Sequence, residues 1–597
     1  MTQKIPISAS IQQQSIHALL SAVSGETEAK PDCYRLYAVS VVREKRDKPM
    51  KKLVPLFMAI GMIFVIVLGF FGFKMVQKYT PSKEPADLSK IYGVSGDETA
   101  IIYNYEVQEV KGIYKNGQSY LPLSWINANI NKRFYWDSTE NLLVYALPDQ
   151  IVYADAETKG SNGASLLLLE EDDVYLPLGL IANYTNIQIQ AFDGDEIKRV
   201  YITQWGKRET ARINKDGKVR QKGGIKSPIV TEVLHDMEVT VLDTMESWTK
   251  IQTMDGHIGY IENKVIAGLS NKDFRGSFAE PEYKSTKMEE KIVLGWHQVT
   301  SMEGNKTLDA AVEKTKGLNV ISPTWFSLTD NDGNYKSLAS RDYVDKAHEK
   351  GLKVWALLDN FSQDVQSEVL LASTGTRRKL INSLMDDVEK YDLDGLNMDF
   401  ESLKPEAGVH YIEFLRELSI PCRQKGIVLS VDNYVPAGYN EFYDRKEQGI
   451  VTDYVIIMGY DEHYAGGEPG SVASLPYVQG GISRTLEQVP KEKIINGVPF
   501  YTRVWTETDE GVKSSAIGIA EARRWVQDNH VELYWQQELG QFYGELSIED
   551  GVKYLWLEEE DSLTLKMKAI KEADLAGVAC WKLGLEDAAA WDSITWD

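Results

Sequence analysis

The sequence is poor in cysteine and in basic residues, and each shortage excludes a class of protein. Its 597 residues include three cysteines, Cys33, Cys422 and Cys580, with no Cys-x-x-Cys pair. Neither a disulfide framework nor a zinc knuckle is therefore expected, and Cys580, in an apolar segment, is expected to be a small core residue. Lysine and arginine number 65 against 88 aspartates and glutamates, a net charge of −23. Since no basic stripe offsets this excess, we expect no nucleic-acid partner.

Long uncharged apolar runs are also absent, except at residues 53–73. That run has the roughly 20 residues that a membrane-spanning helix needs. Basic residues are more frequent before it (Arg43, Lys45, Arg46, Lys48, Lys51 and Lys52) than after it (Lys74 and Lys78). This bias predicts a cytoplasmic tail over 1–52, a single-pass transmembrane helix over 53–73, a linker over 74–90 and an extracellular remainder. A cleaved signal peptide is the alternative, which the long polar stretch ahead of the run disfavours. Few cysteines in an outside location fit a bacterial cell membrane.

An internal repeat follows the linker. Tyr120-Leu-Pro-Leu-Ser-Trp-Ile recurs as Tyr175-Leu-Pro-Leu-Gly-Leu-Ile, and each copy leads into a β-like segment. The repeat predicts a small α+β domain over 91–205, built from a duplicated strand–helix–strand unit. It resembles the domain named after the N-terminus of copper amine oxidase. No copper is expected here, because no histidine cluster accompanies the repeat.

Short alternating strands are predicted over 206–270, separated by turns such as Asp255-Gly256. The ending Trp248-Thr-Lys-Ile, then Asp-Gly-x-x-Gly-Tyr-Ile, resembles that of bacterial SH3 domains. An unrelated small β-barrel with a buried Trp248 remains the alternative. The resemblance implies a cell-wall ligand, which these residues do not identify.

Strands alternate with helical patterns over 288–597. The expected strands are 292–299, 318–325, 353–358, 393–400, 427–431, 454–460, 494–500 and 577–583. Between them lie amphipathic segments such as 376–391, where Leu380, Leu384, Val388 and Tyr391 recur at helical spacing. Eight such units predict an α/β fold, a (β/α)8 TIM barrel with its site at the carboxyl ends of the strands. Two further β-like pieces, 541–546 and 552–557, are expected to form an insertion over the barrel mouth.

The most informative run is 392–401, Asp-Leu-Asp-Gly-Leu-Asn-Met-Asp-Phe-Glu. Alternate residues of a strand point the same way, so Asn397, Asp399 and Glu401 should emerge on one face. Crowded carboxyls raise the pKa of at least one of them, as a general acid near neutrality requires. An acidic strand end with a capping aspartate is the non-catalytic alternative.

This run resembles the signature of glycoside hydrolase family 18, Asp-Gly-x-x-x-Asp-x-Glu, a family of chitinases and related N-acetylglucosaminidases. Met458-Gly-Tyr460-Asp461 is similar to the family's Met-x-Tyr-Asp, and Trp581 stands where the family keeps a tryptophan as the floor of the sugar site. The resemblance covers roughly 290–597. Further candidates for substrate contact at or near strand ends are Asp394, Asn397, Trp296, Trp325, Trp355, Asn433 and Tyr501. Each tryptophan taken alone is better explained by core packing, and the family pattern reverses this preference only for Trp581.

The resemblance implies a substrate-assisted mechanism that retains the anomeric configuration and needs no metal or cofactor. Glu401 would protonate the glycosidic oxygen, and the acetamido carbonyl of the −1 sugar would attack the anomeric carbon to give an oxazolinium. Asp399 would hold the acetamido N–H, and Tyr460 would hydrogen-bond the acetamido oxygen. Glu401 would then act as a base toward water.

One position departs from the chitinase pattern, which has aspartate where this chain has Asn397. We expect that Asp399 shares no proton with a second carboxylate there, so that its pKa is lower than in a chitinase. With asparagine at this position, the motif resembles that of the spore-cortex-lytic branch of the family. The run Tyr460-Asp-Glu-His-Tyr-Ala-Gly-Gly also resembles that branch.

The leading hypothesis is a membrane-anchored extracellular glycosidase that cleaves β-1,4 bonds after N-acetylglucosamine, in peptidoglycan in preference to chitin. A catalytically silent glycan-binding or scaffold protein on a degenerate barrel is the second hypothesis. Retention of Glu401 argues against it. A nutritional chitinase is the third, and an anchor at the producer's own membrane disfavours it.

Overall fold

The computed structural model describes residues 50–160, 163–170 and 173–596. The expected tail before residue 50, with Cys33, lies outside them. The helix α1 (Met50–Tyr79) belongs to a compact unit separate from the rest of the chain, and the two are described individually. Within Val54–Tyr79 an 18-residue window has a mean hydropathy of 2.7 and none of that window is buried, so the length and composition of the helix suffice to cross a membrane. It is longer than the apolar run, since helix continues through Lys74 and Lys78.

The repeat folds as two strand–helix–strand units. The first consists of β3 (Gln118–Pro122), α3 (Leu123–Asn129) and β4 (Tyr135–Asp137), and the second of β8 (Asp173–Pro177), α4 (Leu178–Asn183) and β9 (Gln188–Phe192). Strands β3 and β8 pair antiparallel, with Leu121 opposite Leu176, which are equivalent positions of the two copies. The flanking β1 (Glu98–Tyr103), β2 (Glu106–Lys115), β7 (Leu168–Glu170) and β10 (Lys198–Thr203) complete a seven-stranded sheet. In a separate three-stranded sheet, β5 (Leu142–Ala146) pairs with β4 on one side and with β6 (Ile151–Ala154) on the other.

A second seven-stranded sheet forms the SH3-like domain, in the order β13-β12-β16-β15-β14-β11-β17. Its strands are β11 (Gly206–Ile213), β12 (Gly217–Arg220), β13 (Ile229–Val233), β14 (Glu238–Thr244), β15 (Trp248–Gln252), β16 (Ile258–Glu262) and β17 (Ile266–Phe274). Part of the segment expected to be a linker is paired with this domain. Pro85 bridges Ile229 in parallel, and the Ala86 N–H donates to the Ile229 carbonyl at 2.7 Å. A free β13 edge would leave these backbone groups without partners, which explains the pairing.

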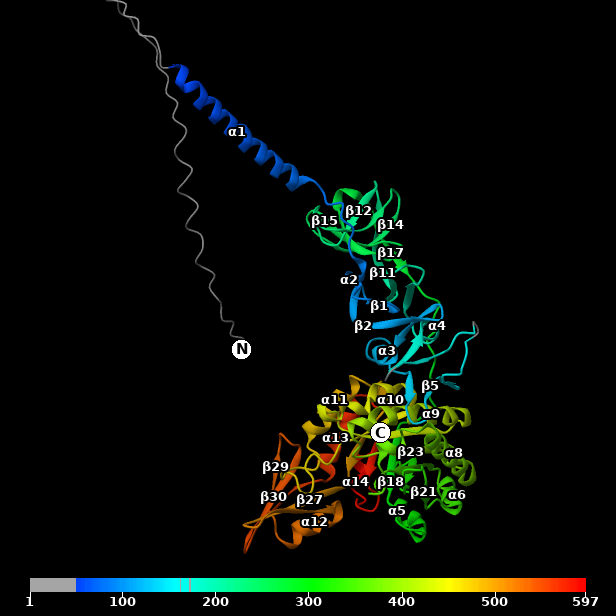
Figure 1. Ribbon diagram of the computed structural model, residues 1–597. Helices are drawn as coiled ribbons and strands as arrows, with labels where there is room; N and C mark the ends of the chain where they lie inside the picture. The colour runs from blue at the N-terminus through cyan, green and yellow to red at the C-terminus, as the bar shows by residue number, and fades with distance from the viewer. Residues whose placement is uncertain (1–49, 161–162, 171–172, 597) are drawn as a thin grey trace, which may run out of the picture. The chain divides into compact units, whose positions relative to one another are not determined.

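Eight parallel strands close the predicted barrel (Figure 1), whose helices surround them. In chain order the strands are β18 (Ile292–His297), β19 (Val320–Pro323) with β20 (Phe326–Leu328), β22 (Lys353–Asp359), β23 (Gly395–Asp399), β24 (Val428–Tyr434), β25 (Tyr454–Met458), β26 (Ile494–Pro499) and β32 (Gly577–Trp581). Closure comes from β18 pairing with β32 on one side and β19 on the other. The prediction of a (β/α)8 fold is confirmed, and Cys422 and Cys580 lie buried in its core.

The helices that cover the barrel include α6 (Arg341–Glu349), α8 (Thr374–Tyr391), α9 (Gly408–Lys425), α10 (Arg445–Val451), α11 (Leu475–Leu486) and α13 (Glu560–Glu572). Helix α8 begins where Ser373 accepts a hydrogen bond from the Thr376 N–H and ends at Asp392 in a left-handed conformation. Its buried face includes Leu380, Leu384 and Val388, as the helical spacing predicted. These helices bury the outer face of the barrel, and side chains of the strands themselves fill its interior, which is why the strands are almost uniformly apolar.

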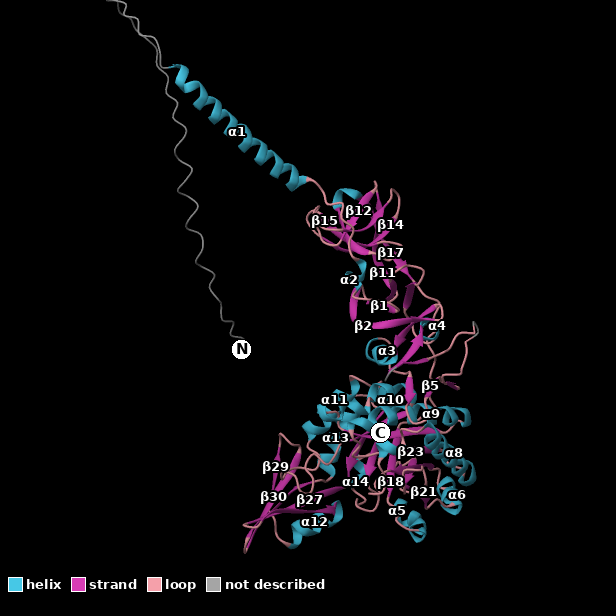
Figure 2. Cartoon of the chain, in the orientation of Figure 1, coloured by secondary structure: helices cyan, strands magenta, loops and turns pink. Residues whose placement is uncertain are grey.

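The insertion between β26 and α13 is larger than the sequence indicated. Five strands form it, in the order β28-β27-β31-β30-β29 (Figure 2). They are β27 (Tyr501–Thr508), β28 (Gly511–Gly518), β29 (Leu533–Gln536), β30 (Gln541–Ile548) and β31 (Gly551–Leu557), and α12 (Ile519–Asp528) packs on one face. Only β30 and β31 had been predicted. Strand β28 is largely exposed and polar, so its sequence has no clear β alternation.

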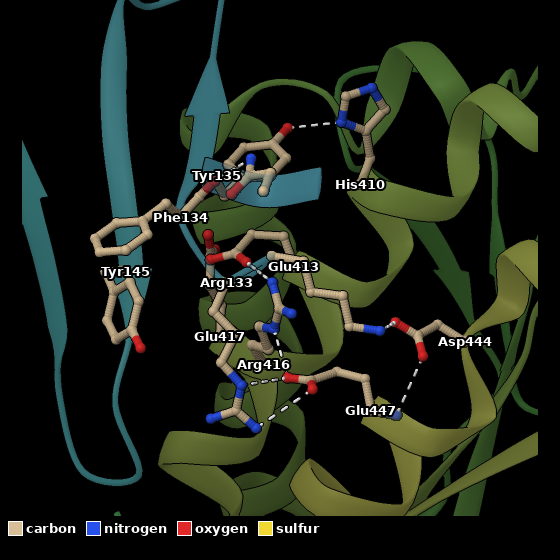
Figure 3. A network of polar contacts seen from close by, with 12 residues as sticks. Arg133, Phe134, Tyr135, Tyr145, His410, Glu413, Arg416, Glu417, Asp444 and Glu447 are labelled. Atoms are coloured by element: carbon tan, nitrogen blue, oxygen red, sulfur yellow. Dashed lines mark hydrogen bonds and ion pairs between the residues drawn. The ribbon is translucent and has the colours of Figure 1, made fainter. Parts of the chain in front are cut away.

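Charged and aromatic side chains are buried between the repeat domain and the outer face of the barrel (Figure 3). The Arg133 guanidinium lies 3.0 Å from the Glu447 carboxylate, and the Tyr135 hydroxyl lies 2.7 Å from His410 Nδ1. The network consists of Arg133 and Tyr135 from the repeat domain and Arg377, His410, Glu413, Arg416, Glu417 and Glu447 from α8, α9 and α10. Removing one member of such a buried ion pair leaves an uncompensated charge, so this contact joins the two domains firmly.

Candidate active site

A cavity of about 140 Å³ opens at the carboxyl ends of the barrel strands. Parallel strands bring residues that are far apart in sequence to this edge. Its lining is acidic and aromatic, without lysine or arginine: Trp296, Phe361, Asp399, Glu401, Asp432, Tyr434, Met458, Tyr460, Asp461 and Trp581. The structure thus brings together Glu401, Asp399 and Tyr460, the three residues expected to be catalytic.

Glu401 is held both at its side chain and at its backbone. Its Oε2 accepts a hydrogen bond from the Tyr434 hydroxyl at 2.6 Å. Its backbone N–H donates to Asn360 Oδ1 at 2.9 Å, and its carbonyl accepts from Asn360 Nδ2 at 3.0 Å. Burial raises the pKa of the Glu401 carboxyl, the Tyr434 hydrogen bond lowers it, and the charges of Asp461 and Asp359 raise it, with a net upward shift. A glutamate with a raised pKa can be protonated near neutrality.

Asp399 is the last residue of β23 and is nearly inaccessible. Its Oδ1 is buried and has no hydrogen-bond partner among the residues that the structure describes. Burial raises the pKa of its carboxyl well above the usual range, and the nearby charges of Asp432, Glu401 and Asp359 add to the rise. An orphaned carboxylate oxygen at a pocket wall can accept a hydrogen bond from a ligand N–H.

Asn397 lies beneath the pocket, completely buried, and its orientation follows from its partners. Its Oδ1 accepts from Trp296 Nε1 at 2.9 Å and from the Ser322 hydroxyl at 3.1 Å, while its Nδ2 donates to Asp432 Oδ1 at 2.9 Å. Burial raises the pKa of the Asp432 carboxyl to about 8. Position 397 supplies no carboxylate to share a proton with Asp399, but the charge of Asp432 on the neighbouring strand adds to the rise in the pKa of Asp399. A lower pKa for Asp399 than in a chitinase stays a prediction.

Aromatic rings also line the pocket. The Trp296 ring centroid lies 5.8 Å from that of Trp581 and 6.5 Å from that of Tyr460, both edge to face. Tyr501 is outside the lining but supports it, since its hydroxyl donates to Asp461 Oδ1 at 2.5 Å. As the motif predicted, Met458 ends β25, and Tyr460 and Asp461 come shortly after it at the pocket. Rings of this kind stack on the apolar faces of sugars.

Asp394 does not line the pocket, so the structure does not bring it together with the other candidates for substrate contact. Its carboxylate accepts hydrogen bonds from Lys353 Nζ at 2.8 Å and from the Val354 N–H at 2.9 Å, and it lies 2.7 Å from His348 Nε2. Five strand positions separate Asp394 from Asp399, about 16 Å at about 3.3 Å per residue. The aspartate therefore stabilises the amino end of the barrel.

Three further candidates belong to the core. Trp325 donates from Nε1 to Asn305 Oδ1 at 2.8 Å. Trp355, in the first half of β22, stacks on Tyr454 with ring centroids 5.6 Å apart. Asn433 points to the helix layer, where its Nδ2 donates to Gln448 Oε1 at 2.7 Å. None of the three lines the cavity, because proximity to a strand end does not decide which side a residue faces.

The sequence reasoning missed Asp432, Tyr434, Asn360 and Phe361. Alternation along β24 would have identified the first two, since Ser430, Asp432 and Tyr434 share one face and Asn433 the other. Phe361 is 56% exposed and lines the pocket just after β22. Among the described residues, no group of three or more His, Cys, Asp or Glu side chains is arranged to hold a metal ion.

Comparisons with known proteins agree with this geometry. The family model of glycosyl hydrolases family 18 matches residues 258–586, and that of the bacterial SH3 domain matches residues 215–267. The uncharacterized glycosylase YvbX of Bacillus subtilis (strain 168) is 27% identical over 295 residues, 46% of this chain and 84% of that protein. The cortical fragment-lytic enzyme of the same organism is 27% identical over 237 residues, 38% of this chain and 55% of that protein.

Chitinase A1 of Niallia circulans is 22% identical over 280 residues, 38% of this chain and 39% of that protein. The chain thus spans about half or less of the length of these last two relatives. Among solved structures, the spore cortex-lytic enzyme SleL of Bacillus cereus is 21% identical with a TM-score of 0.47, covering 54% of this chain and 77% of that one. The family match extends over more than half of the chain, and this protein belongs to glycosyl hydrolases family 18.

Proposed function

We propose that this protein is a membrane-anchored, extracellular glycosidase that cleaves β-1,4 bonds after N-acetylglucosamine by substrate-assisted, retaining hydrolysis. The observation that carries the proposal is the meeting of Glu401, Asp399 and Tyr460 in one pocket beside Trp581. A silent glycan-binding protein needs no buried acid with a raised pKa, whereas a glycosidase does.

The first step uses the proton of Glu401. The carboxyl donates it to the glycosidic oxygen, the bond from the anomeric carbon to that oxygen breaks, and the acetamido oxygen of the same sugar bonds to the anomeric carbon. The orphaned Asp399 Oδ1 accepts the acetamido N–H, and the Tyr460 hydroxyl donates to the acetamido oxygen. Burial raises the pKa of both Asp399 and Asp432, and the positive charge of the oxazolinium that forms beside Asp399 favours the ionised form of that carboxyl.

In the second step, the Glu401 carboxylate takes a proton from water as the water oxygen bonds to the anomeric carbon and the oxazolinium ring opens. The acid is restored and the configuration is retained, because the carbon has been attacked twice from opposite faces. The reaction as proposed uses the residues of this pocket and no cofactor.

Peptidoglycan is the substrate we favour. Its support comes from the SH3-like domain, for which we propose a cell-wall ligand, and from the relative named cortical fragment-lytic enzyme. Chitin remains the second candidate because Chitinase A1 also matches. The resemblance of residues 91–205 to the copper amine oxidase N-terminal domain stays a prediction, and we propose no separate ligand for it.

Digestion of purified peptidoglycan should release fragments with N-acetylglucosamine at the new reducing end. Muramic acid carries a lactyl ether beside the acetamido group, and a cavity of about 140 Å³ closed by Asp399, Tyr460 and Trp581 has little room for it. Borohydride reduction followed by acid hydrolysis should therefore give glucosaminitol. Predominant muramicitol would make the enzyme a muramidase, and release of oligomers from chitin alone would make it a chitinase.

The proposed anchor is α1, with the N-terminus in the cytoplasm. Protease added to intact cells should release a fragment that contains the barrel, while an epitope tag at the N-terminus stays protected. Recovery of a mature protein that lacks α1 from the medium would instead identify the helix as a cleaved signal sequence. Protection of the barrel would reverse the proposed topology.

A further inference from the structure

Within the described part of the chain, the Tyr434 hydroxyl is the one hydrogen-bond donor to the Glu401 carboxyl, and a third group determines the direction in which that hydroxyl donates. The Ser402 N–H donates to the Tyr434 hydroxyl oxygen at 3.3 Å. The hydroxyl proton itself is then directed to Glu401 Oε2, 2.6 Å away. Ser402 has a left-handed backbone, φ +52°, which turns its N–H toward the tyrosine directly after the acid.

We propose that Tyr434 is a positioning residue for the catalytic acid: it holds Oε2 of Glu401 and leaves Oε1 as the atom that delivers and recovers the proton. This inference rests on the proposed role of Glu401. A carboxyl that rotates freely presents either oxygen, and a misplaced proton donor slows the reaction sharply.

Contacts around Tyr434 show that it is itself held in place. Its backbone carbonyl accepts from Arg445 Nη2 at 3.1 Å, and its ring meets Tyr443 edge to face with centroids 6.3 Å apart. Asn360, directly after β22, bonds both backbone groups of Glu401, and Tyr434 of β24 bonds its side chain, so the acid is anchored at two points. The position of Oε1 is thereby determined.

The same hydrogen bond affects the proton affinity of Glu401. Burial raises the pKa of the Tyr434 hydroxyl above its usual range, so it remains a donor throughout the working pH range. Its bond stabilises the Glu401 carboxylate and lowers the pKa that burial raises. The titratable groups that face Glu401 are Asp359, Asp399, Asp432, Tyr434, Tyr443, Tyr460 and Asp461.

The test is Tyr434→Phe in the full-length protein in detergent. Hydrogen bonds to charged groups are strong enough that kcat should fall about 10- to 100-fold, with KM changed by less than about 3-fold. The alkaline limb of the kcat profile reports loss of the acid proton. Since the phenylalanine no longer stabilises the carboxylate, the pKa of Glu401 rises and this limb should move to higher pH.

Tyr443→Phe is the matched control. Its hydroxyl, next to Tyr434, donates to the Phe400 carbonyl and makes no hydrogen bond with the acid, so the alkaline limb should stay in place. If Tyr434→Phe leaves the limb unmoved or moves it to lower pH, the positioning role is overturned even though the wild type is active. Absence of turnover in the wild type, by contrast, would refute the proposed function itself. Retained binding of an N-acetylglucosamine thiazoline by Tyr434→Phe would show that the variant pocket is folded.

Discussion

Replacing Glu401 with glutamine is expected to abolish hydrolysis of the glycan while leaving folding and glycan binding nearly intact. The amide keeps the shape of the side chain and can still accept the Tyr434 hydrogen bond, but it has no proton to transfer. General acid–base assistance contributes about 10²- to 10⁴-fold, so kcat should fall by at least that range. Release of reducing ends from peptidoglycan measures the loss, and the thermal unfolding midpoint should stay unchanged.

Glu406→Gln provides the control, because this glutamate is exposed a few residues further along the chain and lies outside the pocket. Turnover at the wild-type rate in Glu401→Gln would remove this residue from the mechanism. A wild type that binds glycan strands but releases no reducing ends would favour the silent binding protein. Both results are accessible in the same pair of assays.

The barrel could be predicted because its strands are buried on both faces and therefore appear as apolar runs at regular intervals. The motif residues at 397–401 could be placed because strand alternation and the family signature agree on them. The alternation rule was not applied to β24, and the pocket residues of that strand were therefore missed. Asn433 was chosen because it lies near the end of its strand, although Asp432 and Tyr434 on the same strand face the cavity.

Tertiary contacts explain the remaining differences. A sequence signature does not record the distance between its residues. Asp394 was therefore grouped with Asp399, although the length of a strand separates them. Strand β28 has a polar, exposed sequence and is stabilised by pairing with β27 along its full length. The pairing of Pro85 with Ile229 joins a proline-containing segment to a strand far along the chain, and no local pattern could have indicated that contact.

Asp399→Asn is expected to be as damaging as loss of the acid, for a different reason. No carboxylate would then lie against the acetamido group, and the positive oxazolinium would lose its stabilising charge. Removal of one preorganised electrostatic partner typically costs about 10²- to 10³-fold in kcat. Asp394→Asn is the matched control from the same motif: its ion pairs with Lys353 and His348 lie at the other end of the strand. It should lower stability and leave kcat unchanged.

A substrate with an activated leaving group separates the two catalytic roles. An aryl glycoside whose phenolate departs without protonation does not need the acid in the first step, so Glu401→Gln should recover much of its rate of aryl release. Asp399→Asn should not recover, because the oxazolinium still has to form beside an uncharged amide. The thiazoline analogue, which resembles that intermediate, should likewise bind more weakly to Asp399→Asn than to Glu401→Gln. Equal recovery of both variants would mean that Asp399 acts only through Glu401, and that the orphaned Oδ1 of Asp399 does not contact the acetamido N–H.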